Sequence, residues 1–410
     1  MNRLRGLFIL ILVMVLQVSW YIIGTRTFFQ NGIPERSDFR WFYSVGKVFR
    51  DYGSSHVYNL DLARVYQAQV AGEPVDTEKL LLPNHPPFVF PLMALLARLD
   101  YRTAYYLYFA LVLFIAISSS TVVYRPLRRE NWPQTEALIT IAGIALFEPL
   151  FVSILKGQDT FLLYLGGLFL LTGWVLEKDW LAGIGLGLTL IRPQIALLLV
   201  IPFLVKKRKI WWWFVVSAVA LGLYSFAQIG WNGMLDYLHV LSMSTGVKGY
   251  GWDEVGMLNL VGLILRVAPG LNVDTVHIIG WASYAAALIG LFALSIFSNQ
   301  LRFWHLSVAV SLSLFTAPHL HYHDLALLAI PIIGLGVAGI RHSKFTVTVA
   351  ASLLTATSMV MLLAELWTPV RNTVPYLLMT VLPILTWWCE SRYGWPKWKT
   401  QVTTRVGNGV

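Results

Sequence analysis

Residues 7–24 read LFILILVMVLQVSWYIIG, and no charged residue interrupts the stretch. As a helix it is about 27 Å long, close to the hydrocarbon core of a bilayer at about 30 Å. Arg3 and Arg5 precede it, but no small-residue cleavage site follows it. We therefore expect a retained first membrane helix rather than a cleaved signal peptide.

The rest of the chain repeats this pattern. Of its 410 residues, 57% are hydrophobic and only 13% are charged, with a mean hydropathy of +0.63. Soluble proteins have about 25% charged residues, so the composition excludes a cytosolic enzyme or a secreted scaffold. The alternating pattern of a membrane β-barrel is absent. The sequence predicts an all-α polytopic membrane protein, with one domain over residues 1–390 and a basic cytoplasmic tail over residues 391–410.

Apolar stretches separated by charged or loop-forming residues mark about twelve transmembrane helices. These candidate spans are residues 7–24, 86–99, 101–124, 134–155, 159–177, 180–204, 210–230, 275–297, 303–317, 324–341, 345–366 and 373–389.

The basic residues border these stretches, as topology signals do, so the net charge of +10 does not indicate a nucleic-acid partner. With the N-terminus inside, twelve crossings leave Lys206–Lys209 and the C-terminal tail inside but place Arg125–Arg129 outside. The conflict disappears if residues 86–99 do not cross and residues 180–204 are broken at Arg192-Pro193, where proline removes a helix hydrogen bond. Both topologies remain open.

Two long loops lie on the outer face in either topology, at residues 25–85 and 231–274. The first contains two amphipathic patterns, Asp38–Asp51 and Asn59–Val70, which predict helices lying in the membrane interface. The second contains aromatic and acidic residues that could cover a site or bind an acceptor, namely Tyr250, Trp252, Asp253 and Glu254.

Asp38 stands at the start of the first interfacial pattern, after Ser37. It could cap the helix, since Asp accepts hydrogen bonds from the free N–H groups of a first turn. Its chemistry also allows a catalytic carboxylate at the membrane surface, although a helix cap is the commoner role for such a residue. Glu148 is a second notable acid, because acids inside apolar runs are costly.

The chain resembles glycosyltransferase family 87 over about residues 1 to 340. Five short motifs in the family's order support this: Ser37-Asp38-Phe39-Arg40-Trp41-Phe42-Tyr43 with Val57-Tyr58; Asn84-His85-Pro86-Pro87 with Pro91-Leu92; Lys156-Gly157-Gln158; Gly185-Leu186 through Ile191-Arg192-Pro193-Gln194; and Ala317-Pro318 through His323-Asp324.

The resemblance implies a GT-C fold in the inner (plasma) membrane, acting in cell-envelope glycolipid biosynthesis. It implies an inverting transfer of a sugar, with mannose foremost, from a polyprenyl-phosphate donor to a glycolipid or glycan acceptor on the extracytoplasmic face. Asp38 matches the family's first-loop aspartate and is implied to be the general base. His323 matches a family histidine and is implied to support it. Tyr43 and Gln158 lie in matched motifs and are expected to contact substrate.

The leaving phosphate needs a cation, because it departs with negative charge. Lys156 and Arg192 are the candidates, although the family more often has Lys before its Pro-Gln element. Arg192 could instead anchor a helix break. Arg266 and Arg371 are further outer-side cations without motif support.

Orientation of the sugar or acceptor is expected from Gln194 and His319, the latter in the run His319-x-His321-x-His323-Asp324. His319 and His323 share a face only if this turn is helical. A metal site is not expected, because no third ligand is fixed by spacing.

No phosphate-binding loop is present, so we expect no nucleotide and no cofactor. The single Cys389 excludes an intramolecular disulfide. A transporter or flippase for a lipid-linked sugar or small solute is the alternative function, although such proteins often show two similar halves that this chain lacks. A structural subunit is a third class and would not need Asp38.

Overall fold

The computed structural model describes residues 2–129, 133–243, 254–340, 348–364 and 368–393. Every regular element in these ranges is helical. The α-helices are α1 Asn2–Gln30, α2 Phe39–Tyr52, α3 Leu60–Ala71, α4 Phe90–Leu96, α5 Tyr101–Ser120, α6 Tyr124–Arg129, α7 Gln134–Ala145, α8 Glu148–Leu155, α9 Phe161–Val175, α10 Asp179–Leu188, α11 Pro193–Lys206, α12 Arg208–Met243, α13 Leu260–Val267, α14 Val273–Phe297, α15 Phe303–Thr316, α16 Ala329–Ile340, α17 Thr348–Ala364 and α18 Thr368–Tyr393.

Short 3-10 helices connect many of them. They are η1 Pro34–Arg36, η2 Ser54–His56, η3 Thr77–Lys79, η4 Pro87–Val89, η5 Thr121–Val123, η6 Thr189–Ile191 and η7 Tyr322–Leu328.

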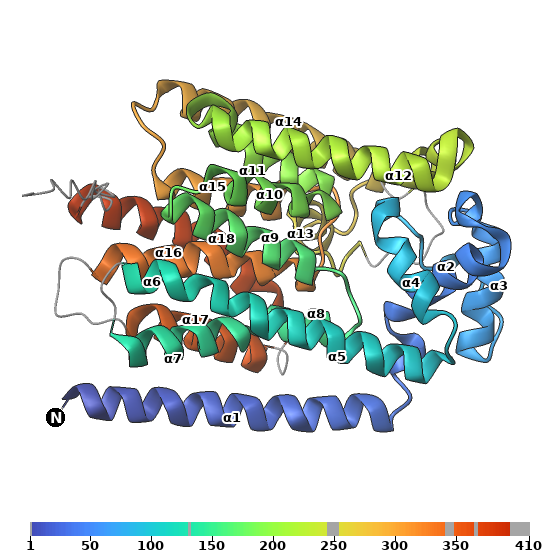
Figure 1. Ribbon diagram of the computed structural model, residues 1–410, viewed down its shortest axis with the longest axis horizontal. Helices are drawn as coiled ribbons and strands as arrows, with labels where there is room; N and C mark the ends of the chain where they lie inside the picture. The colour runs from blue at the N-terminus through green and yellow to red at the C-terminus, as the bar shows by residue number, and fades with distance from the viewer. Residues whose placement is uncertain (1, 130–132, 244–253, 341–347, 365–367, 394–410) are drawn as a thin grey trace, which may run out of the picture.

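Four helical segments are long and apolar enough to cross a membrane, within α1, α5–α6, α12 and α14. A fifth span forms if α7 and α8, bent by 43° at their junction, are taken together. Further apolar helices among the described residues are only 10–17 residues long, and α9, α11 and α15 among them lie in the bundle between α14 and α1 (Figure 1). The chain is therefore a multi-pass helical membrane protein, while the count of twelve spans and the GT-C arrangement stay predictions.

Two features of the second topology are present. Residues 86–99 form only η4 and the seven-residue α4, which is about 10 Å long and too short to cross. Residues 180–204 are broken at Arg192, which separates η6 from α11.

Two other irregularities were not expected, the bend between α7 and α8 and the kink at Gly230 that lets α12 run on to Met243. The loop expected from residue 231 therefore begins as helix.

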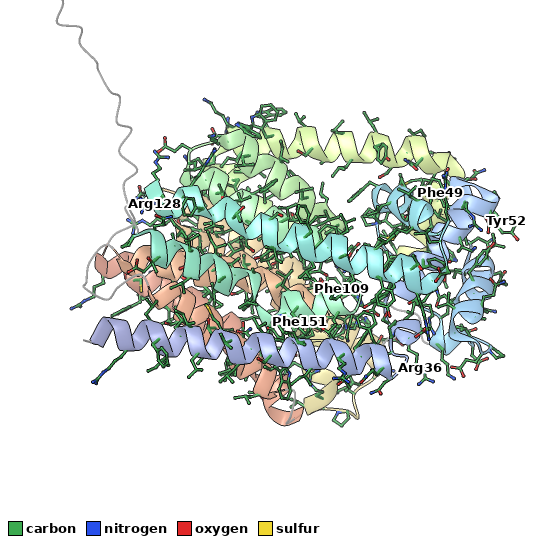
Figure 2. All side chains as sticks on the ribbon, turned by 60° about the horizontal axis from the view of Figure 1, so that its bottom comes forward. Arg36, Phe49, Tyr52, Phe109, Arg128 and Phe151 are labelled. Atoms are coloured by element: carbon green, nitrogen blue, oxygen red, sulfur yellow. The ribbon has the colours of Figure 1, made fainter. Side chains whose placement is uncertain are left out.

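The basic clusters gather at one end of the molecule. The N-terminus, α6 and the end of α18 lie there (Figure 1), and Figure 2 places Arg128 at this end, opposite Arg36 and Tyr52. Arg129 donates to the carbonyl of Val175, and Lys206 to that of Ile296, both at 3.3 Å. The Arg125–Arg129 cluster thus shares an end with Lys206–Lys209, as the positive-inside rule requires.

The opposite end is formed by residues 34–99, called the head below. Helix α2 packs so closely on α4 that a Cβ on Gly46 would lie 2.3 Å from the carbonyl oxygen of Met93. The helices expected at Asp38–Asp51 and Asn59–Val70 are present as α2 and α3. Polar residues of α2 are buried as well: Arg40 donates to the carbonyl of Lys79 at 3.4 Å, and Ser44 is fully buried. Covered on both faces, α2 is not an isolated interfacial helix.

Candidate active site

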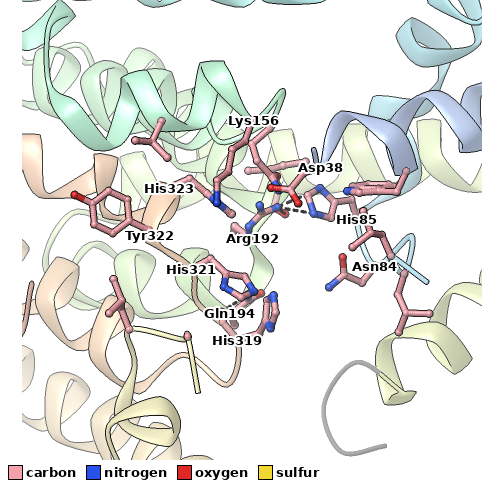
Figure 3. Close-up of a pocket in the computed structure, with 18 of the residues that line it drawn as sticks. Asp38, Asn84, His85, Lys156, Arg192, Gln194, His319, His321, Tyr322 and His323 are labelled. Atoms are coloured by element: carbon pink, nitrogen blue, oxygen red, sulfur yellow. Dashed lines mark hydrogen bonds between the residues drawn. The ribbon is translucent and has the colours of Figure 1, made fainter. Parts of the chain in front are cut away.

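A cavity of about 900 Å³ lies between the head and the helical bundle. Seven of the eight residues expected at the site line it, and Figure 3 shows six of them together with His85 and Asn84. They are Asp38, Lys156, Gln158, Arg192, Gln194, His319 and His323. Tyr43 does not line it, because its hydroxyl donates to the carbonyl of Leu99 at 2.7 Å inside the head.

The start of α2 is fixed against the turn that follows α8. The backbone N–H of Phe39 donates to the carbonyl of Lys156 at 3.2 Å. Gly157 has φ +69°, and a Cβ there would lie 2.6 Å from Cβ of Phe39. Glycine is therefore required at residue 157 both by backbone conformation and by the close approach of α2. This contact brings Asp38 beside Lys156.

Asp38 occupies the N-cap position of α2, but its side chain makes no capping hydrogen bond. Ser37 does not cap the helix either, since its hydroxyl donates to the carbonyl of Pro34 at 2.7 Å. The Asp38 carboxylate is half-buried, lines the cavity and has no hydrogen bond or ion pair to the described residues. A helix cap therefore does not explain this carboxylate.

The two expected cations differ in their surroundings. Lys156 is exposed on the cavity wall and makes no ion pair with the described part of the chain. Arg192 is buried and forms ion pairs with Asp159 at 3.3 Å and Asp324 at 3.2 Å. Two carboxylates already neutralise Arg192, so Lys156 is the cation better placed for a phosphate.

His85 completes a buried cluster with Arg192 and the two aspartates, and we call these four residues the quartet. Its Nδ1 lies 2.5 Å from Oδ2 of Asp159, and its Nε2 lies 3.1 Å from Nη1 of Arg192. A neutral imidazole with the proton on Nδ1 satisfies both contacts, donating to the carboxylate and accepting from the guanidinium. Burial lowers the pKa of His85, opposed by the nearby Asp159, which agrees with the neutral form.

The quartet joins four segments of the chain. His85 precedes η4, Asp159 follows the Lys156 turn, Arg192 stands at the break before α11, and Asp324 lies in η7. The rings of Trp41 and Phe42 on α2 flank His85, with centroids 4.6 and 5.2 Å away. His85 and Arg192 line the cavity, so the quartet links this part of the cavity wall to the head.

The sequence motifs contained His85 and Asp324 but did not show that both contact Arg192, and they missed Asp159 entirely. A signal for Asp159 exists: it is an acid in a long apolar region, the same rule that singled out Glu148. Glu148 begins α8 at its bend with α7, lines the cavity and accepts a hydrogen bond from Tyr322 at 2.6 Å.

The histidine run is not helical before η7. His321 has an extended backbone, and its ring contacts that of His319 at a centroid distance of 4.5 Å. His323, the first of these within η7, lies 3.8 Å from Asp324 through its Nε2. Among the described residues, no group of three or more metal-binding side chains is placed to hold an ion.

Other expected contributors lie elsewhere. Arg266 does not line the cavity and instead donates to the carbonyl of Met257 at 2.8 Å and contacts Tyr376. Glu254 pairs with His277 at 3.0 Å. Tyr250, Trp252, Asp253, the side chain of Arg371 and most of the basic tail fall outside what the structure describes.

The comparison with protein families decides between the function classes. Residues 84–318, more than half of the chain, match glycosyltransferase family 87. The chain belongs to this family. No curated protein and no solved structure matches it. The protein is thus a membrane glycosyltransferase, with a sugar donor and an acceptor as its substrates.

The matched region covers part of the cavity lining. It includes His85, Lys156, Asp159 and Arg192, whereas Asp38 and His323 lie outside it. The placement of the last two in the same cavity comes from the structure of this chain alone.

Proposed function

We propose that the glycosyltransferase transfers a sugar, mannose foremost, from a polyprenyl-phosphate donor to a hydroxyl of a cell-envelope glycolipid or glycan. The observation that carries this proposal is the contact between Phe39 and Lys156. It brings a carboxylate at Asp38 and an ammonium at Lys156 into one cavity, and neither has an ionic partner among the described residues. A displacement at a sugar phosphate needs such a base and such a cation.

The donor lies along α8 in this proposal. Phe151, Val152 and Leu155 line the cavity on this helix, and the line ends at Lys156. On α1, Trp20 and Gly24 line the cavity on the same side, and the Trp20 side chain is 45% exposed. A polyprenyl chain would pass between α1 and α8 into the bilayer, with its phosphate at Lys156.

The reaction is a single displacement. Asp38 takes the proton of the acceptor hydroxyl as the oxygen bonds to C1 of the sugar. The bond between C1 and the phosphate oxygen breaks, and polyprenyl phosphate leaves with the electron pair and a second negative charge. Lys156 stabilises that charge. Attack opposite the leaving group inverts the anomeric carbon, giving an α-glycoside from a β-linked donor.

Neutral groups on the cavity wall would orient the sugars. Gln158 is buried, and its Oε1 has no hydrogen-bond partner in the described residues, so it can accept from a sugar hydroxyl. His323, Gln194 and His319 supply further hydrogen-bonding groups around the same space. None of this chemistry requires a nucleotide or another cofactor.

The gathering of basic clusters at the end opposite the head supports a sidedness. By the positive-inside rule, that end is cytoplasmic, and the head and cavity face the extracytoplasmic side of the plasma membrane.

The test is transfer by purified protein in liposomes containing a panel of polyprenyl-phosphate sugars and cell-envelope lipids, read by mass spectrometry. Asp38→Asn is expected to lower transfer at least about 100-fold, the usual contribution of a general base. Asp61→Asn is the matched control, since the Asp61 side chain is 91% exposed on α3. Retained transfer in Asp38→Asn would exclude Asp38 as the base. Substrate binding or translocation without a glycoside product would favour the transporter alternative.

A further inference from the structure

Helix α12 is longer than a bilayer is thick. Its 36 residues extend over about 54 Å, whereas a hydrocarbon core is about 30 Å thick. Gly230, with φ 66° and ψ −169°, interrupts the helical backbone and leaves about 33 Å of helix before it and about 20 Å after it. The part before the kink is long enough to cross the membrane alone. Residues 231–243, called the distal segment below, are then left beyond the span, where α12 reaches the head (Figure 1).

The composition of the exposed surface changes at the same place. From residue 210 to residue 230, all of which the structure describes, no exposed side chain carries a charge or an amide. Val216, Val219 and Leu223 are 54%, 53% and 66% exposed in this part of α12. Exposed amide and charged side chains begin again at Asn232. The change indicates that the hydrocarbon core ends close to the kink.

One face of the distal segment packs on the head. The rings of Tyr237 and Tyr58 lie with their centroids 5.0 Å apart. Just before the kink, the Ser54 hydroxyl donates to the carbonyl of Gln228. Tyr58 in turn donates to the carbonyl of His85 at 2.7 Å, so the packing reaches the quartet.

The rest of the distal segment has an apolar face and a polar face, both exposed. The apolar residues recur at helical spacing and are 67%, 49% and 55% exposed, in the order Trp231, Leu235 and Leu238. The polar residues lie about 100° farther round the helix, and they are Asn232, Asp236 and His239. A helix with one apolar and one polar exposed face suits the boundary between lipid tails and water, where Trp is also enriched.

We propose that the distal segment binds the bilayer interface at the head end, with Trp231, Leu235 and Leu238 among the lipids and Asp236 in water. The partner is the phospholipid bilayer itself. Through its third face the segment fixes the height of the head, and with it the quartet and the cavity, relative to the hydrocarbon core. The inference does not depend on which donor or acceptor the enzyme uses.

Nitroxide labels on single cysteines test the contact in phospholipid liposomes, in protein with Cys389→Ser. Leu235→Cys and Asp236→Cys are adjacent but lie on different faces, and Leu223→Cys in the span and Asp61→Cys in the head are the references. We expect oxygen to relax the label at residue 235 more than a water-soluble nickel complex does, as at residue 223. The label at residue 236 should show the reverse, as at residue 61.

Two outcomes of this experiment would overturn the inference. Stronger relaxation by nickel at both residue 235 and residue 236 would place the apolar face in water. Little relaxation by either reagent at residue 235 would mean that protein, from this chain or a second copy, covers that face.

Hydrogen exchange in the same liposomes tests whether the segment holds the head. Leu235→Glu with Leu238→Glu adds two charges to the apolar face, and Asn232→Glu with His239→Glu adds two to the polar face as the matched control. Amide exchange over residues 54–58 should rise at least about tenfold in the first variant and match the wild type in the second. Exchange in α9, inside the bundle, should be unchanged in both, which shows that they are folded. Equal exchange of the head in the two variants would contradict a head held through the membrane contact.

Discussion

At the scale of single residues, charge pairing distinguishes the two cations of the cavity. Arg192 contacts two buried carboxylates, while Lys156 has no ionic partner among the described residues. Removing one partner of a buried ion pair leaves an uncompensated charge and costs about 3–5 kcal/mol. Removing an exposed, unpaired lysine costs little stability. Substitution of Lys156 should therefore lower activity, whereas substitution of Arg192 should lower stability.

Lys156→Met is expected to lower the rate of transfer roughly 10- to 100-fold, the loss of one charge-assisted hydrogen bond in the transition state. Its melting temperature should remain that of the wild type. Arg192→Met should instead lower the melting temperature, because Asp159 and Asp324 then lose their partner. The measurement is thermal unfolding of both purified variants alongside transfer rates. A stable Arg192→Met protein with a raised donor KM would assign the phosphate to Arg192.

His85 gives a pH dependence whose sign follows from its surroundings. Its pKa in the folded protein lies below the ordinary value of about 6.5, so the unfolded chain binds a proton that the folded chain does not. Stability contributed by this residue is complete above about pH 6.5 and falls as the pH drops below it, by at most about 1.4 kcal/mol per pH unit.

His85→Asn should therefore have a melting temperature that depends less on pH between 6.5 and 5 than that of the wild type. Asp159 and Arg192 contact the imidazole, and the lowered pKa of the first and the raised pKa of the second keep both charged over this range, so they do not reverse the sign. His319 is also held neutral and leaves a residual slope. Identical slopes in the two proteins would show that His85 is protonated when folded.

At the scale of elements, one glycine turn joins the head to the bundle. Gly157 has a positive φ and approaches Phe39 within a distance that excludes a Cβ. Gly72, which ends α3, has nearly the same φ of +70° but an added Cβ there meets nothing within 4 Å. Alanine at either residue adds backbone strain of roughly 1 kcal/mol, but only alanine at residue 157 would also displace α2. Comparing the two variants therefore separates these two effects.

Gly157→Ala is expected to lower transfer more than about tenfold, because a shift of about 1 Å in a catalytic group commonly costs this much or more. Gly72→Ala carries similar backbone strain but should retain the wild-type rate. Transfer rates are compared at equal amounts of folded protein. Equal loss in both variants would mean that strain, rather than the placement of Asp38, limits activity.

Sequence patterns predicted some elements and not others for physical reasons. Two features were predicted from local signals. Amphipathic patterns predicted α2 and α3, and Pro193 predicted the helix break at Arg192. The burial of Arg40 depends on residues near Lys79, and the pairing of His85 with Asp159 spans 74 positions. Contacts of this kind depend on tertiary packing, which periodicity does not encode. The motifs pointed to eight site residues, and seven of them line one cavity. The motifs did not show which charged residues are held in ion pairs and which have no ionic partner among the described residues.

At the scale of the whole molecule, all basic clusters within the described residues that border apolar helices lie at the end away from the head. The structure thereby removes the conflict over Arg125–Arg129 that the twelve-span count created. The bend between α7 and α8 and the break at Arg192 place polar backbone beside the cavity, where irregular segments are tolerated in membrane proteins. The same irregularities that obscure a count of spans therefore build the site.

This arrangement makes the sidedness testable in intact cells. With Cys389 replaced by Ser, a single cysteine at Asp61 in the head should react with a membrane-impermeant maleimide added outside. A single cysteine at Asn299, which joins α14 to α15 at the basic end, should react only after permeabilisation. Both residues are exposed, so accessibility to the reagent decides the result rather than burial. Labelling of Asn299→Cys alone in intact cells would invert the orientation and place the cavity on the cytoplasmic side, where a lipid-linked donor of the outer leaflet could not reach it.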